Sequence, residues 1–233
     1  MKILFVLNQN EIGGAEKFVF DLCSHFDLKG YDVSIFFLKQ GNYEFFNGDI
    51  CFKKKILFGN KYSLFSPLAI FKLVLLSRKF DIIHVNLFPS FYLAFFIKIF
   101  SKVKLIYTEH STFNRRRVIP IIRNLDRLFY NIYDSIICIN TDVKNSLINH
   151  LGFNYKISTI ENGINLDFIK NVPRININKL IPTIKESDFV LCQVSSFIEP
   201  KDQMTIVQAM RYLPENVKLI LVGDGTKRRN VEN

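Results

Sequence analysis

The feature that most constrains this sequence is an alternation of short apolar runs with longer amphipathic ones. The short runs, such as residues 2–7, are rich in β-branched and aromatic residues, as β-strands are. The longer runs, such as residues 15–28, place apolar side chains at the spacing of one helix face. βαβ units around a parallel sheet produce this order, so we expect an α/β fold.

Residues 1–164 are expected to form a first domain of this type. The predicted strands are mostly apolar, as doubly covered strands should be, and span residues 2–7, 32–38, 81–86, 104–109, 135–140 and 157–161, with a weaker one near 50–57. The predicted helices span residues 15–28, 67–79, 89–100, 119–131 and 142–151. Segment 87–100 is apolar nearly all round, but it contains Lys98 and is shorter than the roughly 20 residues of a membrane span. We expect a buried helix there, with one side able to rest on a membrane surface.

The pattern changes after Gly163. Residues 165–187 are polar, contain two prolines and show no clear periodicity, as expected of a linker between domains. A second unit follows over residues 188–233, with predicted strands at 189–194 and 217–222 and a predicted helix at 203–213. One βαβ unit of roughly 45 residues leaves sheet edges and helix faces without partners, so we expect an incomplete second domain.

Composition narrows the class of protein. With 48% hydrophobic and 22% charged residues, the chain is expected to fold rather than to be disordered. The four cysteines show no C-x-x-C spacing, which favours a reducing cytoplasm, and the apolar run at the start is too short for a signal peptide. The formal net charge of +10 favours anionic partners such as phosphorylated ligands, acidic lipid headgroups or nucleic acid. The basic runs 53–55, 115–117 and 227–229 fit solvated surfaces as well as contact sites.

Two features of the first domain indicate a ligand site at the carboxyl edge of its sheet. Gly13 and Gly14 lie between the first strand and the first helix, where glycine lets the backbone approach a ligand and free N–H groups favour an anion. His84 and His110 end two predicted strands, at the edge where open α/β sheets bind ligands. Tight turns also use glycine structurally, and a histidine at a strand end is often structural. No metal-ligand spacing accompanies either histidine.

In the second unit, Lys201 lies after a predicted strand and just before a predicted helix. An ammonium group beside helix-start N–H groups can bind a diphosphate. A lysine that is simply solvated is the alternative. The second predicted strand of this unit ends in the turn Gly223-Asp224-Gly225.

These motifs, in this order along the whole chain, resemble glycosyltransferase family 4, whose members have the GT-B architecture of two Rossmann-like domains. The resemblance rests on six segments: Gly13-Gly14-Ala15-Glu16, Asp81-Ile82-Ile83-His84, Thr108-Glu109-His110, Glu161-Asn162-Gly163-Ile164, Ser195 to Gln203, and Leu221-Val222-Gly223-Asp224-Gly225. It implies transfer of a sugar from a nucleotide diphosphate sugar with retention of configuration, without a metal or another cofactor.

The resemblance also implies roles for individual residues. His110 would sit at the reaction centre, with Glu16 and His84 on the acceptor side. The residues that would bind the donor and its diphosphate are Gly13, Gly14, Ser196, Lys201, Gly223 and Gly225. Family members often carry arginine where this chain has Ser196, which leaves the diphosphate one fewer cation. The family segment whose two glutamates complete the donor site is expected beyond residue 233.

The expected partners are a nucleotide diphosphate sugar and a saccharide or lipid-linked saccharide acceptor. The setting would be bacterial surface polysaccharide or glycolipid synthesis in the cytoplasm, with peripheral contact at the inner face of the membrane. A non-catalytic protein that binds nucleotide sugars or sugar phosphates is the main alternative, favoured by Ser196 and the incomplete second domain. A GT-B sugar-nucleotide epimerase shares the architecture. Nucleic acid is not expected as a partner, because clustered cations with interleaved aromatic residues are not found beyond residues 115–117.

Overall fold

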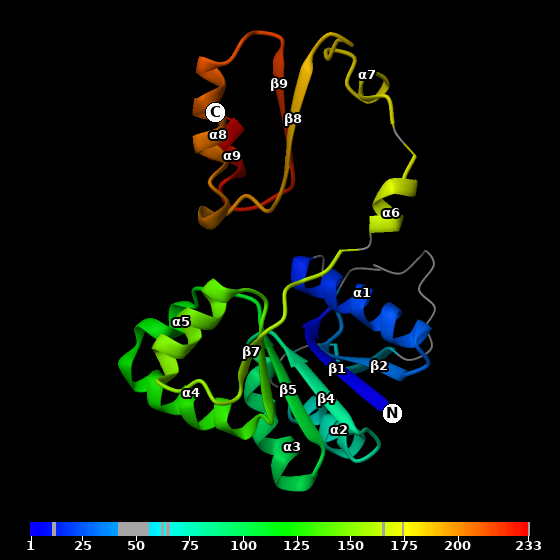
Figure 1. Ribbon diagram of the computed structural model, residues 1–233, viewed down its shortest axis with the longest axis vertical. Helices are drawn as coiled ribbons and strands as arrows, with labels where there is room; N and C mark the ends of the chain where they lie inside the picture. The colour runs from blue at the N-terminus through cyan, green and yellow to red at the C-terminus, as the bar shows by residue number, and fades with distance from the viewer. Residues whose placement is uncertain are drawn as a thin grey trace. The chain divides into compact units, whose positions relative to one another are not determined.

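A computed structural model describes residues 1–10, 13–41, 56–61, 63, 66–164, 166–173 and 175–232. The chain forms two compact units, Met1–Asn165 and Leu166–Asn233, and each is described by itself (Figure 1). The first unit covers the predicted first domain, and the second begins with the predicted linker. The predicted strand residues 50–55 and the basic run 53–55 lie outside the described residues.

The first unit is built on a parallel sheet of seven strands in the order β3-β2-β1-β4-β5-β6-β7. The strands are β1 (Lys2–Gln9), β2 (Asp32–Lys39), β3 (Ile56–Asn60), β4 (Ile82–Asn86), β5 (Lys104–Glu109), β6 (Ser135–Cys138) and β7 (Ile157–Thr159). The chain winds outward from β1 to β3, returns to the other side of β1 and continues to β7. This doubly wound topology confirms the predicted α/β class with a Rossmann-like parallel sheet.

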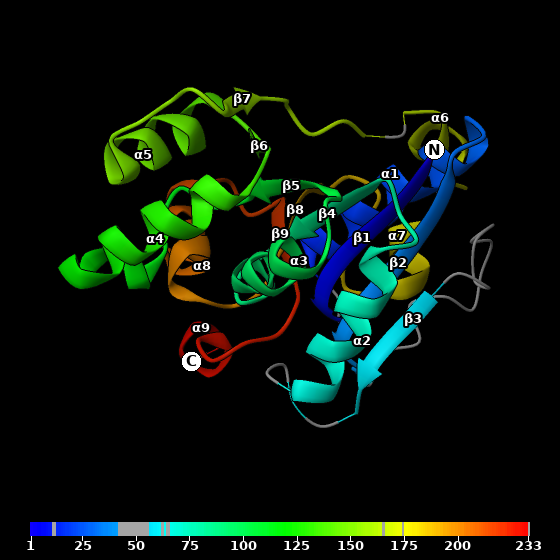
Figure 2. The ribbon, with the colours of Figure 1, turned by 90° about the horizontal axis from the view of Figure 1, so that it is seen from below.

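Amphipathic segments between the strands form helices that cover both faces of the sheet. They are α1 (Gly14–Leu28), α2 (Pro67–Ser77), α3 (Ala94–Phe100), α4 (Pro120–Ile132) and α5 (Thr141–Leu151). α1 packs on one face, whereas α2 to α5 contribute to the hydrophobic cluster on the other face. Figure 2 looks at the sheet from the side of α2 and α3.

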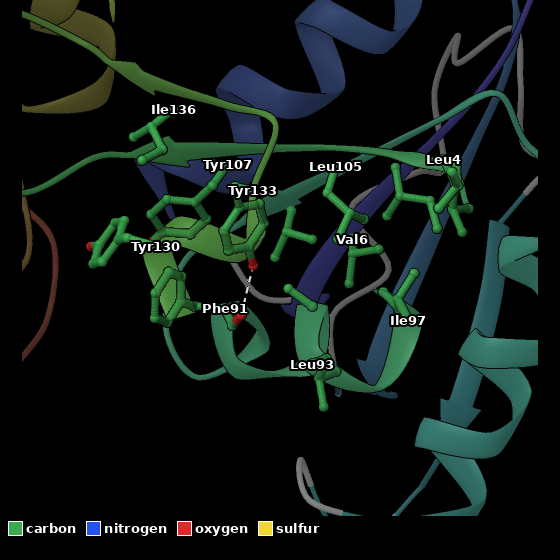
Figure 3. Packing of buried hydrophobic residues seen from close by; sticks show 14 of the residues in the cluster. Leu4, Val6, Phe91, Leu93, Ile97, Leu105, Tyr107, Tyr130, Tyr133 and Ile136 are labelled. Atoms are coloured by element: carbon green, nitrogen blue, oxygen red, sulfur yellow. Dashed lines mark hydrogen bonds between the residues drawn. The ribbon is translucent and has the colours of Figure 1, made fainter. Parts of the chain in front are cut away.

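The larger hydrophobic cluster has an aromatic centre under α3 and α4. The ring centroid of Phe91 lies 4.4 Å from that of Tyr130 and 5.5 Å from that of Tyr133. The Tyr133 hydroxyl donates a hydrogen bond of 2.6 Å to the carbonyl oxygen of Phe91, which satisfies its polar end inside the core (Figure 3). The smaller cluster joins α1 to β1 and β2 through Val19, Phe20 and Cys23.

The predicted helix at 89–100 is two helices in succession. A 3₁₀ helix, η2 (Ser90–Leu93), precedes α3. The Ser90 hydroxyl donates to the carbonyl oxygens of Asn86 at 2.6 Å and Leu87 at 2.8 Å. This side chain therefore fixes the backbone where η2 begins. Among the described residues, no helix is both long enough and apolar enough to cross a membrane.

In some places a single residue, rather than the pattern of apolar residues, decides where a strand or helix ends. The strand predicted over 135–140 stops at Cys138, because Asn140 is the N-cap of α5 and accepts a hydrogen bond of 2.8 Å from the Val143 backbone N–H. α5 then ends at Gly152, whose φ of +77° is in the left-handed region that glycine adopts without strain.

The second unit contains a two-stranded parallel sheet of β8 (Phe189–Val194) and β9 (Val217–Val222). The 3₁₀ helix η4 (Glu199–Lys201), α8 (Gln203–Ala209) and the 3₁₀ helix η5 (Met210–Tyr212) connect these strands, so the predicted helix at 203–213 ends as a 3₁₀ turn. α6 (Leu166–Asn171) and α7 (Ile177–Leu180) occupy part of the predicted linker, and α9 (Arg228–Glu232) follows β9. Helices of so few residues contain too few turns for the spacing of apolar residues to predict them.

Candidate active site

The site residues predicted in the first unit lie where β1, β4 and β5 end. These strands are neighbours, because β1 pairs with β4 and β4 pairs with β5. Gly13 and Gly14 follow β1, His84 lies inside β4 and His110 follows β5 directly. Since parallel strands end at one edge, the structure brings these residues to the carboxyl edge of the sheet, beside its topological switch point.

His84 packs within the sheet rather than at its open edge. Its ring centroid lies 5.0 Å from that of Phe5 on β1, and its Nε2 lies 2.6 Å from Oγ1 of Thr108 on β5. Burial and then the charge of His110 lower the pKa of His84 to about 3, so the ring is neutral at pH 7. Because only 8% of its surface is exposed, His84 can support the edge of the sheet, and its place on the acceptor side stays a prediction.

His110 is half-buried and hydrogen-bonds to a buried amide. Its Nε2 lies 3.2 Å from Oδ1 of Asn86, and the ring of Phe18 on α1 stands edge-on at 6.2 Å. The Asn86 Nδ2 donates to the carbonyl oxygen of His84 at 3.2 Å, which orients the amide so that its oxygen faces His110. An amide oxygen only accepts hydrogen bonds, so Nε2 of His110 carries the proton.

The protonation state of His110 follows from this bond and from burial. Desolvation lowers the pKa of His110 to about 4, so the ring is neutral at pH 7. A neutral ring with its proton on Nε2 has a lone pair on Nδ1. The edge of the sheet therefore holds a histidine nitrogen able to accept a hydrogen bond or a proton.

Two polar residues of this edge were given no role from the sequence. Asn86 ends the apolar strand β4, and Asn8 lies near the end of β1. The Asn8 side chain donates to the carbonyl oxygen of Phe88 at 2.7 Å and accepts from the Ser90 backbone N–H at 3.1 Å, so it holds the loop after β4. The available signal was a polar residue at the end of an otherwise apolar strand.

Glu109, which precedes His110, anchors the end of β5 in a buried polar cluster. Its Oε2 lies 2.6 Å from Nη2 of Arg117 and accepts a hydrogen bond of 2.6 Å from the Tyr130 hydroxyl. Both side chains of the ion pair are buried. Arg117 is thus a structural cation of the core rather than a solvated one.

The glycine pair after β1 is not explained by backbone conformation. Gly13 is the N-cap of α1 with an extended φ of −149°, and Gly14 is the first residue of the helix. A Cβ added at Gly14 would meet no described atom within 4 Å, whereas one at Gly13 would meet the flexible carboxylate of Glu16. The turn itself therefore does not require glycine at residue 14, and no described atom occupies the space beside it. Residues 11 and 12 of the motif lie outside the described residues.

In the second unit, Lys201 and Ser196 lie on the connection between β8 and α8. Gln203 is buried, and its Nε2 donates to Oγ of Ser195 at 3.0 Å and to the carbonyl oxygen of Ser196 at 2.9 Å, which holds this connection. The ammonium of Lys201 is exposed and forms no ion pair with the described residues, whereas Lys227 pairs with Glu199 at 2.6 Å. Lys201 is thus available to an anionic ligand.

The start of α8 is already occupied by a carboxylate. Asp202 is the N-cap of α8, and its side chain accepts hydrogen bonds from the Thr205 N–H at 3.4 Å and the Thr205 hydroxyl at 2.8 Å. The expectation that helix-start N–H groups here are free for a diphosphate therefore holds only in part.

Gly223 and Gly225 join the two loops of the second unit through close backbone contact. Their φ angles are +148° and +155°, in a region that essentially only glycine adopts. A Cβ at Gly223 would collide with the carbonyl oxygen of Ser195, and one at Gly225 would lie 2.5 Å from that of Phe197. These glycines are needed to build the loops, and a contact with the donor would be an additional role.

Across the described part of the chain, no group of three or more His, Cys, Asp or Glu side chains could hold a metal ion.

A model of the family described as Glycosyltransferase Family 4 matches residues 12–168, about two thirds of the chain. The chain belongs to glycosyltransferase family 4. The matched segment of this family-4 chain contains the glycine pair, both histidines and the polar residues that hold them. No curated protein sequence matches the chain significantly.

Solved structures similar to this family-4 chain include glycosyltransferases with different substrates. HepE from Anabaena, in complex with UDP and glucose, has a TM-score of 0.76 at 18% identity and covers 100% of this chain and 64% of its own. Sucrose-phosphate synthase from Thermosynechococcus elongatus has a TM-score of 0.73 at 16% identity, with coverage of 99% and 66%. The lipopolysaccharide outer core galactosyltransferase WaaB has a TM-score of 0.63 at 16% identity, with coverage of 100% and 63%. The chain thus spans about 64% of the length of HepE and shares the GT-B fold over that part.

Proposed function

We propose that the complete protein transfers a sugar from a nucleotide diphosphate sugar to an acceptor with retention of configuration. The observation that supports this best is the neutral His110, whose Nδ1 lone pair lies at the carboxyl edge of a family-4 sheet. The complex of the similar HepE with UDP and glucose supports a nucleotide sugar as the donor class.

In this proposal the residues of the first unit orient the reacting groups. His110 accepts a hydrogen bond through Nδ1 from a hydroxyl group of the donor sugar or acceptor, while Asn86 keeps its ring in the required orientation. The open space at Gly14 lets the ligand approach the backbone closely. Glu16, three residues after the N-cap of α1, lies on the acceptor side.

In the second unit, Lys201 stabilises the negative charge that develops on the leaving diphosphate. Ser196 and the backbone of the Gly223 and Gly225 turn complete the part of the donor site that this chain contains. Charge stabilisation of this kind needs no metal. Because Ser196 supplies no cation, Lys201 carries a larger share of the charge than a lysine paired with an arginine would.

We further propose a saccharide or lipid-linked saccharide acceptor, in bacterial surface polysaccharide or glycolipid synthesis. The protein would act in the cytoplasm and contact the inner face of the membrane peripherally. The net charge of +10 and the exposed aromatic residues of α3 support this setting.

A non-catalytic protein that binds a nucleotide sugar or sugar phosphate is the second candidate. Ser196 in place of a cation favours it, and so does Asp202, whose carboxylate lies at the helix start where a phosphate would otherwise bind. Such a protein would bind the donor without releasing a nucleoside diphosphate.

The experiment that tests the proposal measures nucleoside diphosphate release from a panel of nucleotide sugars by the complete protein. We expect His110→Ala and Lys201→Ala each to lower kcat by roughly 100-fold or more, the size typical of losing one group that stabilises transition-state charge. His25→Ala and Lys185→Ala are matched controls and should leave kcat within about twofold, because both residues are exposed and Lys185 precedes β8, at the end of the strand opposite to Lys201.

Two results would decide against the proposal. Donor binding by the wild-type protein without any release of nucleoside diphosphate supports the non-catalytic alternative. Unchanged kcat in both the His110 and Lys201 variants, with turnover in the wild type, shows that other residues carry the reaction.

A further inference from the structure

One apolar stripe of helix α4 faces solvent, although Phe129, Tyr130 and Ile132 of the same helix pack in the core. Ile121, Leu125 and Leu128 lie at i, i+4 and i+7 on one face, and their exposed fractions are 79%, 46% and 66%. Asp126, on the opposite side, is fully buried. An amphipathic helix of a globular domain ordinarily turns such an apolar stripe towards the core.

Three polar residues on other sides of α4 bind the end of α5 or its neighbours, and Asp126 is the buried one. Asp126 Oδ2 lies 2.9 Å from Nε2 of His150, and Oδ1 accepts a hydrogen bond of 3.2 Å from the Tyr92 hydroxyl. Arg123 donates to the carbonyl oxygen of His150 at 2.7 Å, and Arg127 donates to that of Leu151. These carbonyls end a helix and attract cations. The contacts fix the rotation of α4, so its apolar stripe must face outward.

The neighbouring helices extend this stripe into a surface. α3 packs between α2 and α4, and Figure 2 shows α2 and α3 on the same side of the sheet. We call the set of exposed large apolar residues on these three helices the apolar helix face: Leu68, Phe71, Leu75, Phe95, Phe96, Ile99, Phe100, Ile121, Leu125 and Leu128. Among the described residues of α1 and α5, only Leu28 is a large apolar residue with comparable exposure. Exposed apolar residues gathered on three helices that pack against one another are typical of an interaction site.

The segment that carries the apolar helix face has an excess of positive charge, although Lys98 on α3 pairs with Asp134 just after the segment. Residues 66–132 contain eleven lysines and arginines but only three acidic residues, Asp81, Glu109 and Asp126. Each of the three is engaged: Asp81 accepts from the Lys2 backbone N–H, Glu109 binds Arg117 and Asp126 binds His150. The exposed cations of this segment include Arg78, Lys79 and Lys102.

We propose that the apolar helix face docks onto a bilayer that contains anionic phospholipids, with α4 lying in the plane of the interface. Apolar side chains enter the boundary between headgroups and acyl chains, while the surrounding lysines and arginines bind the headgroups. Each such cation near an anionic surface contributes attraction that salt screens. A second copy of the chain fits less well, because an isologous dimer would bring two cationic surfaces together. This inference deepens the membrane contact of the proposed function but does not depend on sugar transfer.

The test is co-sedimentation of the complete protein with phosphatidylcholine vesicles and with vesicles containing phosphatidylglycerol, at low and high salt. We expect at least about tenfold stronger binding to the anionic vesicles and a loss of binding at high salt. The variant Ile121→Ser, Leu125→Ser, Leu128→Ser should lose at least about tenfold of that binding. It should keep its melting temperature, because the three side chains are exposed.

The matched control replaces three exposed apolar residues that lie off the face, Leu28→Ser, Ile164→Ser and Tyr212→Ser, whose exposed fractions are 78%, 70% and 88%. It should bind vesicles as the wild type does. Equal binding by both triple variants, or no preference for anionic vesicles, overturns the proposal. Self-association that only the α4 variant loses, without vesicle binding, assigns the face to a second copy instead. Vesicle binding needs no turnover, so its outcome is independent of the transferase assay.

Discussion

The two units of this chain build the carboxyl edges of their sheets in different ways. In the first unit, polar side chains hold the edge, as Asn86 holds His110 and Arg117 holds Glu109. In the second unit, backbone contacts hold it, because Gly223 and Gly225 press against the carbonyl groups of the opposing loop. The loop after a strand in a βα unit can thus be held either by pairs of side chains or by close backbone contacts that only glycine allows.

This difference changes what a glycine motif means in each unit. Gly223 and Gly225 have φ angles that other residues rarely adopt, so their presence is explained by the fold alone. Gly14 has a helical position and open space beside it, so the fold alone does not explain it. Substitutions at both edges can separate the two explanations.

The largest expected effect is the loss of the buried ion pair in the first unit. Glu109→Ala removes the carboxylate partner of Arg117 and a hydrogen-bond acceptor of Tyr130, so the free energy of unfolding should fall by about 3–5 kcal/mol. Urea denaturation monitored by circular dichroism measures this change. Asp21→Ala, which breaks the exposed pair with Lys17, is the control and should cost no more than about 1 kcal/mol. A loss below 1 kcal/mol for Glu109→Ala would show that side-chain pairing does not hold this edge.

A somewhat smaller effect is expected for glycine in the second unit. Gly225→Ala forces an L-residue to a φ of +155° and places a Cβ 2.5 Å from the Phe197 carbonyl oxygen, so we expect about 2–3 kcal/mol of destabilisation. Hydrogen exchange of the β8 and β9 amides detects it, because the change should be confined to the second unit. Gly163→Ala, where an added Cβ meets no described atom, is the control. Equal exchange in both variants would remove the structural explanation for Gly225.

The histidines of the first edge predict a pH dependence of stability. Their pKa values in the folded state are about 3 for His84 and about 4 for His110, below the ordinary value of 6.5. Between pH 6.5 and 4 the unfolded chain therefore binds more protons, and stability should fall as the pH falls, by up to about 1.4 kcal/mol per pH unit for each histidine. Unfolding measured at pH 7 and pH 5 tests this. His84→Gln should flatten the dependence, and a slope identical to that of the wild type would contradict the assignment.

The sequence predicted most strands of the first unit well, because each lies on an apolar run rich in β-branched or aromatic residues. The exception is β3, which spans Ile56–Asn60 and overlaps the strand predicted near 50–57 only at its end. The sequence could not predict the rotation of α4. The apolar stripe of Ile121, Leu125 and Leu128 indicates a helix face turned inward, yet Asp126 is buried through its contact with His150 on α5. A pairing between two helices decides that outcome, and helical periodicity contains no information about it.

The candidate site, like the fold, was predictable from the sequence only in part. His110 could be placed at a sheet edge from the strand that precedes it. The bond from Asn86, which sets the protonated nitrogen of His110, joins neighbouring strands that are 24 residues apart in sequence. The burial that lowers the pKa of His84 likewise depends on strand order and on the packing of Phe5, neither of which a single segment reveals.

The smallest expected change in stability is at Gly14, and its sign is opposite to that at Gly225. Gly14→Ala puts a better helix former at the first position of α1 without a steric collision, so stability should rise by a few tenths of a kcal/mol. If the glycine is there to let a ligand approach, the Michaelis constant for the nucleotide sugar should rise in the complete protein although the fold is more stable. Thermal melting and initial-rate kinetics on the same variant measure the two effects. A more stable variant with unchanged kinetics would mean that the open space beside Gly14 is not used by the donor or acceptor.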